Sequence, residues 1–216
     1  MSPSKSNLSV DETRRSLIEA GRQVFSEDGF DGARVDRIAE LAGVNKALIN
    51  YHFGGKQQLF QAIIEDFTAQ LATGLQSAID PTASPEDQLR QFVRHMANAV
   101  ARHPEFPRLM LFESTKKNAL PDPPPQHMLL VMQTLAKILD QGYRAKRFKR
   151  LNPFFAHFHM MSSFAFYHVG RPLRERLRGK FPIPEEVFST EAFNAFVEDQ
   201  ILSGFALQPT RNSEGD

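Results

Sequence analysis

The sequence predicts an all-α protein of about nine helices, and three observations carry this prediction. Apolar residues recur at helical spacing through most of the 216 residues. Alternating apolar runs and clear hairpin turns, which would indicate β-strands, are missing. Glycine and proline breaks divide the helical pattern into a short N-terminal group and a longer remainder. We therefore expect a three-helix N-terminal domain followed by a larger C-terminal helical bundle.

Composition excludes several classes of protein. Hydrophobic residues make up 41% and charged residues 24%, which is ordinary globular usage and argues against a disordered body. No apolar run reaches the roughly 18–20 residues that span a bilayer, and the N-terminus lacks an apolar signal-peptide core. Cysteine is absent, which excludes disulfides and thiolate metal sites. We expect a cytoplasmic protein with no membrane partner.

The first helix is expected at residues 11–28, between polar residues and a glycine. Residues 1–10 are predicted to form a flexible tail, as are residues 208–216 at the other end. Ser9 or Asp11 can cap the helix start. Gly29 should end the helix, after which Phe30 can fold back onto its apolar face.

The next two helices have the pattern of a helix-turn-helix. They are expected at Val35–Leu41 and Lys46–Phe53. Such a unit needs a small residue where the helices cross and a glycine of positive φ at the turn, which are Ala39 and Gly43 here. Apolar residues then lock the second helix onto the first; these are Val44 and Ile49, with Ile38 and either Leu48 or Phe53 completing the core.

Residues 11–56 are therefore predicted to form a DNA-binding domain whose second turn helix enters the major groove. Bulk charge gives this prediction no support. Residues 1–56 carry eight Lys and Arg and also eight Asp and Glu, and the whole chain has a net charge of only +1. The prediction depends on the placement of basic residues rather than on their number.

The segment ARVDRIAELAGVNKALINYHFGGKQQLFQAI closely resembles the DNA-binding head of TetR-family repressors, and the likeness covers about residues 13–64. The resemblance implies that recognition-helix residues meet base edges and phosphates. It also implies that Lys56 meets the DNA backbone at the start of the fourth helix, where a cation and free N–H groups can both bind phosphate. The implied DNA-binding residues are Arg34, Arg37, Lys46, Ala47, Asn50, Tyr51, His52 and Lys56.

The segment departs from the family pattern at two positions. Arg34 stands where a Ser or Thr often caps the second helix, so Asp36 or the backbone has to replace the cap. Asn50 stands where the family often has Tyr. An asparagine can bond adenine N6 and N7 together, or contact a phosphate.

Residues 57–207 are expected to form the ligand-binding and dimerisation domain. A long helix starts at Lys56, and another starts at Pro85 with Ser84 as its N-cap. The remaining helices are expected at Arg108–Ser114, Met128–Tyr143, Asn152–Leu177 and Thr190–Leu207, with a loop at Pro121–Pro125. Gly170 and Pro172 are expected to disturb the long helix at Asn152–Leu177. The family resemblance implies that the last two long helices form a four-helix dimer interface.

Phenylalanine occurs 19 times, and residues 154–167 read FFAHFHMMSSFAFY. A helix that is apolar on several faces is buried on several sides. One interpretation is core plus dimer interface. The other is a pocket for a small hydrophobic effector, which His95, His157 or Ser162 could orient. The candidate pocket residues are Phe67, Met96, Phe112, Met132, Phe158 and Met161.

Other functions find less support in the sequence. His157 and His159 lie two residues apart, on different faces of a helix, so they cannot share a metal ion. The basic run Arg144–Arg150 is best explained as a solvated helix end. An enzyme or a protein-interaction module on the same bundle is the alternative, but no phosphate loop, nucleophile elbow or metal motif is present. We expect a homodimeric repressor without cofactor, which a small hydrophobic effector releases from a palindromic operator.

Overall fold

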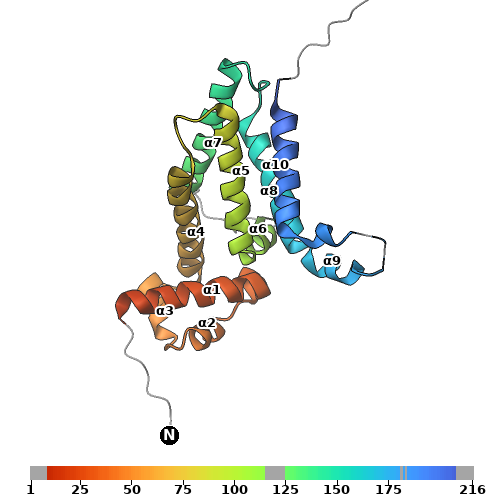
Figure 1. Ribbon diagram of the computed structural model, residues 1–216. Coiled ribbons are helices and arrows are strands. Elements are labelled where there is room, and N and C mark those ends of the chain that lie inside the picture. The colour runs from red at the N-terminus through yellow and green to blue at the C-terminus, as the bar shows by residue number, and fades with distance from the viewer. Residues whose placement is uncertain (1–8, 115–124, 181, 183, 208–216) are drawn as a thin grey trace, which may run out of the picture. The chain divides into compact units, whose positions relative to one another are not determined.

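The computed structural model describes residues 9–114, 125–180, 182 and 184–207, and these residues confirm the all-α prediction (Figure 1). They form ten α-helices, one 3-10 helix and a single isolated β-bridge. No helix in this part of the chain combines the length and apolar character that crossing a bilayer requires. The expected tail at 208–216, most of the tail at 1–10 and most of the Pro121–Pro125 loop lie outside the described residues.

The chain forms two compact units, the first comprising residues 1–70 and 103–127 and the second residues 71–102 and 128–216. The first unit contains α1 (Val10–Gly32), α2 (Val35–Leu41), α3 (Ala47–Phe53), most of α4 (Lys56–Ala78) and α6 (Glu105–Ser114). The second contains the end of α4, α5 (Pro85–Arg102), nearly all of α7 (Gln126–Arg144), α8 (Pro153–Val169), α9 (Arg171–Leu177), the 3-10 helix η1 (Glu185–Phe188) and α10 (Thr190–Phe205).

Helix α1 starts at Val10, one residue before the predicted start, and ends at Gly32, four residues after the predicted end. Ser9 is the N-cap, and it forms a capping box with Glu12. Gly29 interrupts the helix with a φ of 69°, as expected of a terminating glycine, but the chain then resumes a last turn that ends at Gly32. The N–H of Ala33 donates to the carbonyl oxygen of Gly29 and closes this turn.

Phe30 folds back onto the end of α1, as predicted. Its ring stacks on Phe25 with 5.8 Å between ring centroids and meets Phe60 of α4 edge-on at 5.2 Å. Phe25 and Phe60 also make an edge contact at 5.2 Å and are fully buried. This aromatic cluster, Phe25, Phe30 and Phe60, fixes the end of α1 against the start of α4.

The second unit is organised around α5, α8 and α10, which contact one another in pairs. Their core includes Phe92, Phe164 and Ile201, each almost completely buried. At the outside of the α5–α10 contact, Glu198 accepts two hydrogen bonds from the Arg94 guanidinium, at 2.7 and 2.9 Å. Such paired bonds fix the register of two helices as well as their distance.

The single long helix expected at Asn152–Leu177 is wrong, because the chain divides into α8 and α9 at Gly170. Pro172 explains the division. It has no N–H to donate to the preceding turn, and its ring opposes a continuous helix. Asn152 caps α8 as expected for this residue type, accepting a hydrogen bond from the N–H of Phe154 at 2.9 Å.

Other helix boundaries differ by a few residues. Helix α6 starts at Glu105 rather than Arg108, because Pro107 lies in the first turn, where a proline needs no N–H partner. Helix α7 extends the expected Met128–Tyr143 to Gln126–Arg144, and α10 ends at Phe205. The 3-10 helix η1 was not predicted.

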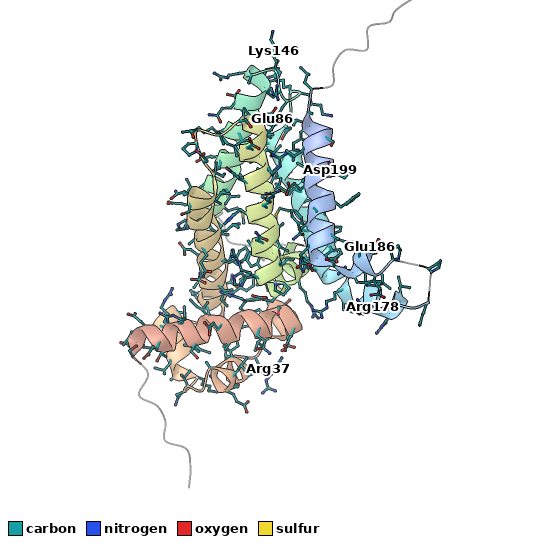
Figure 2. The ribbon with its side chains drawn as sticks, in the orientation of Figure 1. Arg37, Glu86, Lys146, Arg178, Glu186 and Asp199 are labelled. Carbon is teal, nitrogen blue, oxygen red and sulfur yellow. The ribbon has the colours of Figure 1, made fainter. Side chains whose placement is uncertain are left out.

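The chain reverses direction directly after α7, in the second unit. Lys146, labelled in Figure 2, adopts a φ of 57°, which turns the chain back on itself. Phe148 is then buried against Gly142 of α7, and the N–H of Phe148 donates to the carbonyl oxygen of Gly142. The basic run Arg144–Arg150 is thus a helix end and a turn, with Arg147 paired to Glu86 of α5.

Replacing Gly142 with alanine should destabilise the protein, since a Cβ there would lie 2.0 Å from the Phe148 ring. We expect a loss of about 1–3 kcal/mol in the free energy of unfolding, measured by urea denaturation. Gly204→Ala is the matched control, because no atom lies within 4 Å of that Cβ position in α10. It should raise stability by about 0.5–1 kcal/mol. Equal effects of the two variants would contradict this account of Gly142.

Candidate nucleic-acid interface

The helix-turn-helix expected from the sequence is formed by α2 and α3. Gly43 lies between them with a φ of 69°, and open space surrounds the position of its missing Cβ. The backbone conformation, and not crowding, is therefore what requires glycine there. The N–H of Val44 donates to the carbonyl oxygen of Ala39 at 3.0 Å, which closes α2 as the chain turns toward α3.

Helix α3 is seated through one face. Ile49 is 1% exposed, and Ile38 and Ala39 of α2 are also buried. Val44 is half-buried at the edge of this core. The opposite face of α3 is left in solvent, as the predicted role of a recognition helix requires.

The start of α3 depends on a residue that sequence reasoning did not single out. The Asn45 side chain accepts a hydrogen bond from the N–H of Ala47 at 2.8 Å, whereas Lys46 makes no side-chain cap. An asparagine just before a short helix is a known start signal and could have been recognised. It fixes the first turn from which Lys46 and Ala47 project.

The exposed face of α3 brings together most of the predicted DNA-binding residues. Lys46, Ala47, Asn50 and Tyr51 are exposed, and the Tyr51 side chain is 75% accessible. His52 is half-buried, with its ring edge-on to Tyr51 at 5.1 Å. These side chains offer one cation, several hydrogen-bonding groups and an aromatic ring within two helical turns.

Lys56, the first residue of α4, is held by groups from the end of α1. Its Nζ donates to the carbonyl oxygen of Asp31 at 3.2 Å and lies 4.8 Å from the centre of the Phe30 ring. A cation over an aromatic face is stabilised by the ring's electrons. These contacts position the charge but leave other N–H donors of the ammonium group available.

Two predicted basic residues, Arg34 at the N-cap of α2 and Arg37 in its first turn, have different surroundings. Arg37, labelled in Figure 2, is paired with Asp28 at 2.6 Å and with Glu27. Hydrogen bonds to these two carboxylates raise the pKa of Arg37. Arg34 is the N-cap residue of α2 and is exposed, and its side chain makes no capping hydrogen bond, so the helix start is uncapped as expected.

Asp36 does not replace the missing cap. Its Oδ1 instead lies 2.9 Å from Nζ of Lys46, and both side chains are more than half exposed. The hydrogen bond from Lys46 holds the pKa of the Asp36 carboxyl below its usual value. This ion pair crosses the turn between α2 and α3. It was not predicted, because spacing in sequence does not show which charges meet across a turn.

A second polar group joins three helices of the first unit. Nη2 of Arg22 in α1 lies 3.1 Å from Asp66 of α4, and its Nη1 lies 3.3 Å from His103 and 3.7 Å from Glu105 at the start of α6. The Arg22 side chain is only 13% exposed. Each of these contacts is between parts of the chain that are distant in sequence, so none was predicted.

The residues proposed from sequence to line an effector pocket have different surroundings. Phe67 stacks on Phe106 within the first unit, with ring centroids 3.6 Å apart. Met96 is buried in α5, and Met132 and Met161 are half-buried in α7 and α8. Phe158 is 63% exposed. The Phe112 side chain lies outside the described part of the structure.

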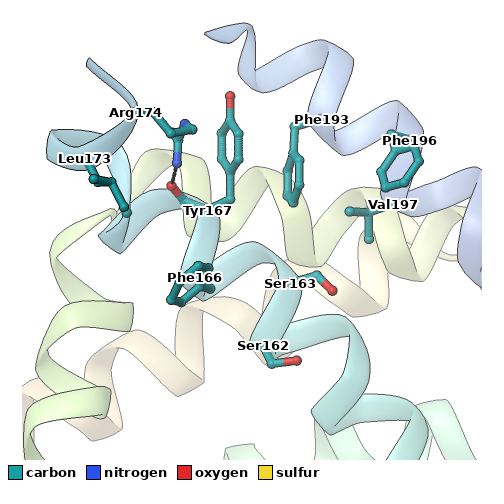
Figure 3. A pocket seen from close by; sticks show the side chains of 10 residues that line it. Ser162, Ser163, Phe166, Tyr167, Leu173, Arg174, Phe193, Phe196 and Val197 are labelled. Atoms are coloured by element: carbon teal, nitrogen blue, oxygen red, sulfur yellow. Dashed lines mark hydrogen bonds between the residues drawn. The ribbon is translucent and has the colours of Figure 1, made fainter. Parts of the chain in front are cut away.

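The hollow described in the second unit has a different lining, from α8, α9 and α10 (Figure 3). Its volume is about 470 Å³. Tyr167 stacks on Phe193 at 3.9 Å, and the Arg174 guanidinium lies over the Tyr167 ring and donates to its carbonyl oxygen. Phe166 and Phe196, at the side, are 73% and 60% exposed. None of the six predicted pocket residues lines this hollow.

Comparison with known proteins identifies both parts of the chain. A family model described as bacterial regulatory proteins of the tetR family matches residues 17–63. A second model, for tetracyclin repressor-like C-terminal domains, matches residues 85–179. The first match contains the whole helix-turn-helix.

Two relatives and one solved structure illustrate the likeness. The HTH-type transcriptional repressor NicS of Pseudomonas putida is 35% identical over 105 residues, which are 49% of this chain and 50% of NicS. The HTH-type transcriptional activator FasR of Mycolicibacterium smegmatis is 31% identical over 107 residues, 50% of this chain and 48% of FasR. The chain thus matches about half the length of these relatives.

The solved structure shows the same fold over nearly the whole chain. The transcriptional regulator FadR from Bacillus subtilis, in complex with stearoyl-CoA, has a TM-score of 0.66 and 16% identity, over 88% of this chain and 98% of FadR.

Proposed function

Because this chain belongs to the tetR family of bacterial regulatory proteins, we propose that it is a transcriptional regulator that binds an operator in duplex DNA. The observation that carries the proposal is the exposed face of α3, seated by Ile49 and presenting Lys46, Asn50 and Tyr51 to solvent. Such a helix can enter the major groove. A regulator of this kind works in the cytoplasm, where bacterial operators lie.

The proposal assigns separate tasks to the basic residues. Lys46, at the start of α3, meets a base edge or a phosphate, while Ala47, Asn50, Tyr51 and His52 complete the surface against the groove. Arg34, Arg37 and Lys56 contact the backbone phosphates. Arg37 keeps free N–H groups for a phosphate even when paired, because a guanidinium carries five donors.

Replacing Lys46 or Lys56 with alanine should weaken DNA binding, measured as the dissociation constant at several salt concentrations. The plot of log affinity against log salt should become shallower by about one for each phosphate that the variant no longer neutralises. Lys137→Ala, in α7, removes the same charge away from α3 and should change neither quantity. Identical binding by all three variants and the unmodified protein would exclude the proposed interface.

We propose that the regulator acts as a homodimer through α8 and α10. Four phenylalanines of α8 and one of α10 are more than half exposed: Phe154, Phe155, Phe158, Phe166 and Phe196. Exposed apolar side chains in such number are typical of an interface, and a second copy of the chain covers like with like. Two DNA-binding domains (residues 11–56, here called heads) related by a two-fold axis would bind half-sites about 34–36 Å apart, so the operator would be palindromic.

Phe166→Glu should shift the protein from dimer to monomer in sedimentation velocity experiments, because it places a charge in an apolar interface. Tyr143→Glu, at a half-exposed aromatic of α7, is the control and should leave the dimer intact. A monomeric Phe166→Glu variant should also lose the preference for palindromic over half-site DNA. If the protein dimerises through another face, both variants should sediment as dimers, which would contradict the proposed interface.

We further propose that a small hydrophobic effector lowers the operator affinity and so relieves repression. FadR, whose fold this chain shares, was solved with stearoyl-CoA, and NicS is a repressor, although FasR is an activator. Within the second unit, the candidate lining residues are Met96, Met132 and Met161, whereas the exposed Phe158 belongs to the proposed dimer interface. An effector acts only through its different affinities for two states, commonly a coupling of about 1–3 kcal/mol.

This coupling is testable with a selected operator duplex and fluorescence anisotropy. Stearoyl-CoA is the first probe, followed by a panel of apolar small molecules, with coenzyme A alone as the polar control. A binding effector should raise the dissociation constant of the operator roughly 5- to 150-fold. An operator affinity that no bound apolar molecule changes would count against effector control.

A further inference from the structure

Two of the basic residues proposed to meet DNA, Arg37 and Lys46, already form ion pairs with carboxylates of residues 11–56. Arg37 is paired with Glu27 and Asp28, and Lys46 is paired with Asp36. These ion pairs agree with the zero formal net charge of residues 1–56, because they place carboxylates beside the cations. The carboxylates are adjacent to the proposed DNA contacts, where they influence any approaching phosphate.

We propose that Asp36 competes with DNA for Lys46, and so weakens binding to DNA of any sequence. This inference rests on the proposed DNA-binding function and names a residue that sets its strength. Nζ of Lys46 and Oδ1 of Asp36 are 2.9 Å apart, within hydrogen-bonding distance. The carboxylate occupies one of the three N–H donors of the ammonium group and neutralises its charge, so a DNA phosphate or base that binds Lys46 competes with Asp36 for it.

The exchange is accessible because the pair is on the surface. The Lys46 side chain is 64% exposed and the Asp36 side chain 54%, so water and salt ions readily replace either partner. Asp36 also lies in the first turn of α2, and the DNA-binding proposal places Arg34, two residues earlier, against a phosphate. A carboxylate there is repelled by the DNA backbone once Lys46 has left it.

Counterions make the competition measurable. A lysine that binds a phosphate releases condensed cations from the DNA, which produces the salt dependence of binding. When Lys46 leaves Asp36, the freed carboxylate gains a cation from solution and offsets part of that release. Removing the carboxylate should therefore tighten binding and steepen its salt dependence together.

The ion pairs of Arg37 have a structural role instead. Arg37 lies in α2 and binds two carboxylates, Glu27 and Asp28, at once. Because both carboxylates belong to α1, these pairs hold α2 against the end of α1. Replacing Glu27 or Asp28 would disturb how α2 sits on α1. The Asp36 pair is instead with Lys46, so substitution of Asp36 isolates the electrostatic effect.

The test uses Asp36→Asn in the full-length protein and an arbitrary duplex of about 30 base pairs, roughly three helical turns. We expect the dissociation constant to fall roughly two- to fivefold for each head, and the log–log salt plot to steepen by up to about one for each head. The thermal midpoint of unfolding should stay within the range of ordinary surface substitutions.

Two controls separate this competition from a general charge effect. Glu40→Gln removes an exposed carboxylate one turn further along α2, and it should have a much smaller effect. In the background of Lys46→Ala, Asp36→Asn should tighten binding less, because the competition for Lys46 is gone and only the repulsion between the carboxylate and DNA remains. Equal tightening by Glu40→Gln, or an unchanged effect without Lys46, would overturn the proposal.

The outcomes also distinguish this inference from the function on which it depends. If neither Lys46→Ala nor Lys56→Ala weakens DNA binding, the proposed interface fails and the inference fails with it. If the lysine variants weaken binding but Asp36→Asn changes neither affinity nor salt dependence, the interface stands and only the role of Asp36 is refuted.

Discussion

The packing of Phe30 against Phe25 and Phe60 is the contact on which the geometry of the head depends. It requires Gly29, whose φ of 69° turns the chain back so that Phe30 reaches the end of α1. The same ring then supports Lys56, which lies 4.8 Å above it. One apolar cluster thus closes α1, anchors the start of α4 and places a cation beside the helix-turn-helix. A change in this cluster would therefore move Lys56, the proposed contact with the DNA backbone, as well as the core.

On this scaffold, the electrostatics are balanced rather than strongly basic. The cations near α2 and α3 include several that are matched by carboxylates, as Lys46 is by Asp36. A strongly basic head would bind all DNA tightly, since phosphate contacts carry most of the sequence-independent affinity. Neutralising part of that charge would leave more of the sequence discrimination to groups proposed to meet base edges, such as Asn50. The zero charge of residues 1–56 is then consistent with DNA binding rather than evidence against it.

Local signals allowed much of the fold to be predicted, and interactions between distant segments explain the rest. The turn glycine Gly43, the cap of α1 and the exposed face of α3 follow from spacing within a few residues. The break at Gly170 was visible in sequence, but its consequence was underestimated, because Pro172 lies in the first turn of a separate helix, α9. The pairing of Arg37 with α1 and the lining of the hollow between α8, α9 and α10 depend on tertiary packing. No local pattern encodes such contacts.

Tertiary packing also holds together the segments of the first unit where the chain leaves it and returns to it. The polypeptide passes from the first compact unit to the second after Gln70, and returns at His103. Arg22 of α1 contacts Asp66, just before the first crossing, and His103, at the second. Its charge is largely buried, so the loss of either partner would be costly, and the three segments favour moving together. A displacement of α4 or of the chain entering α6 would therefore be passed to α1 rather than absorbed, and α1 bears the aromatic cluster that positions Lys56. Arg22 thus makes the positions of α1, of the end of α4 in the first unit and of the start of α6 depend on one another.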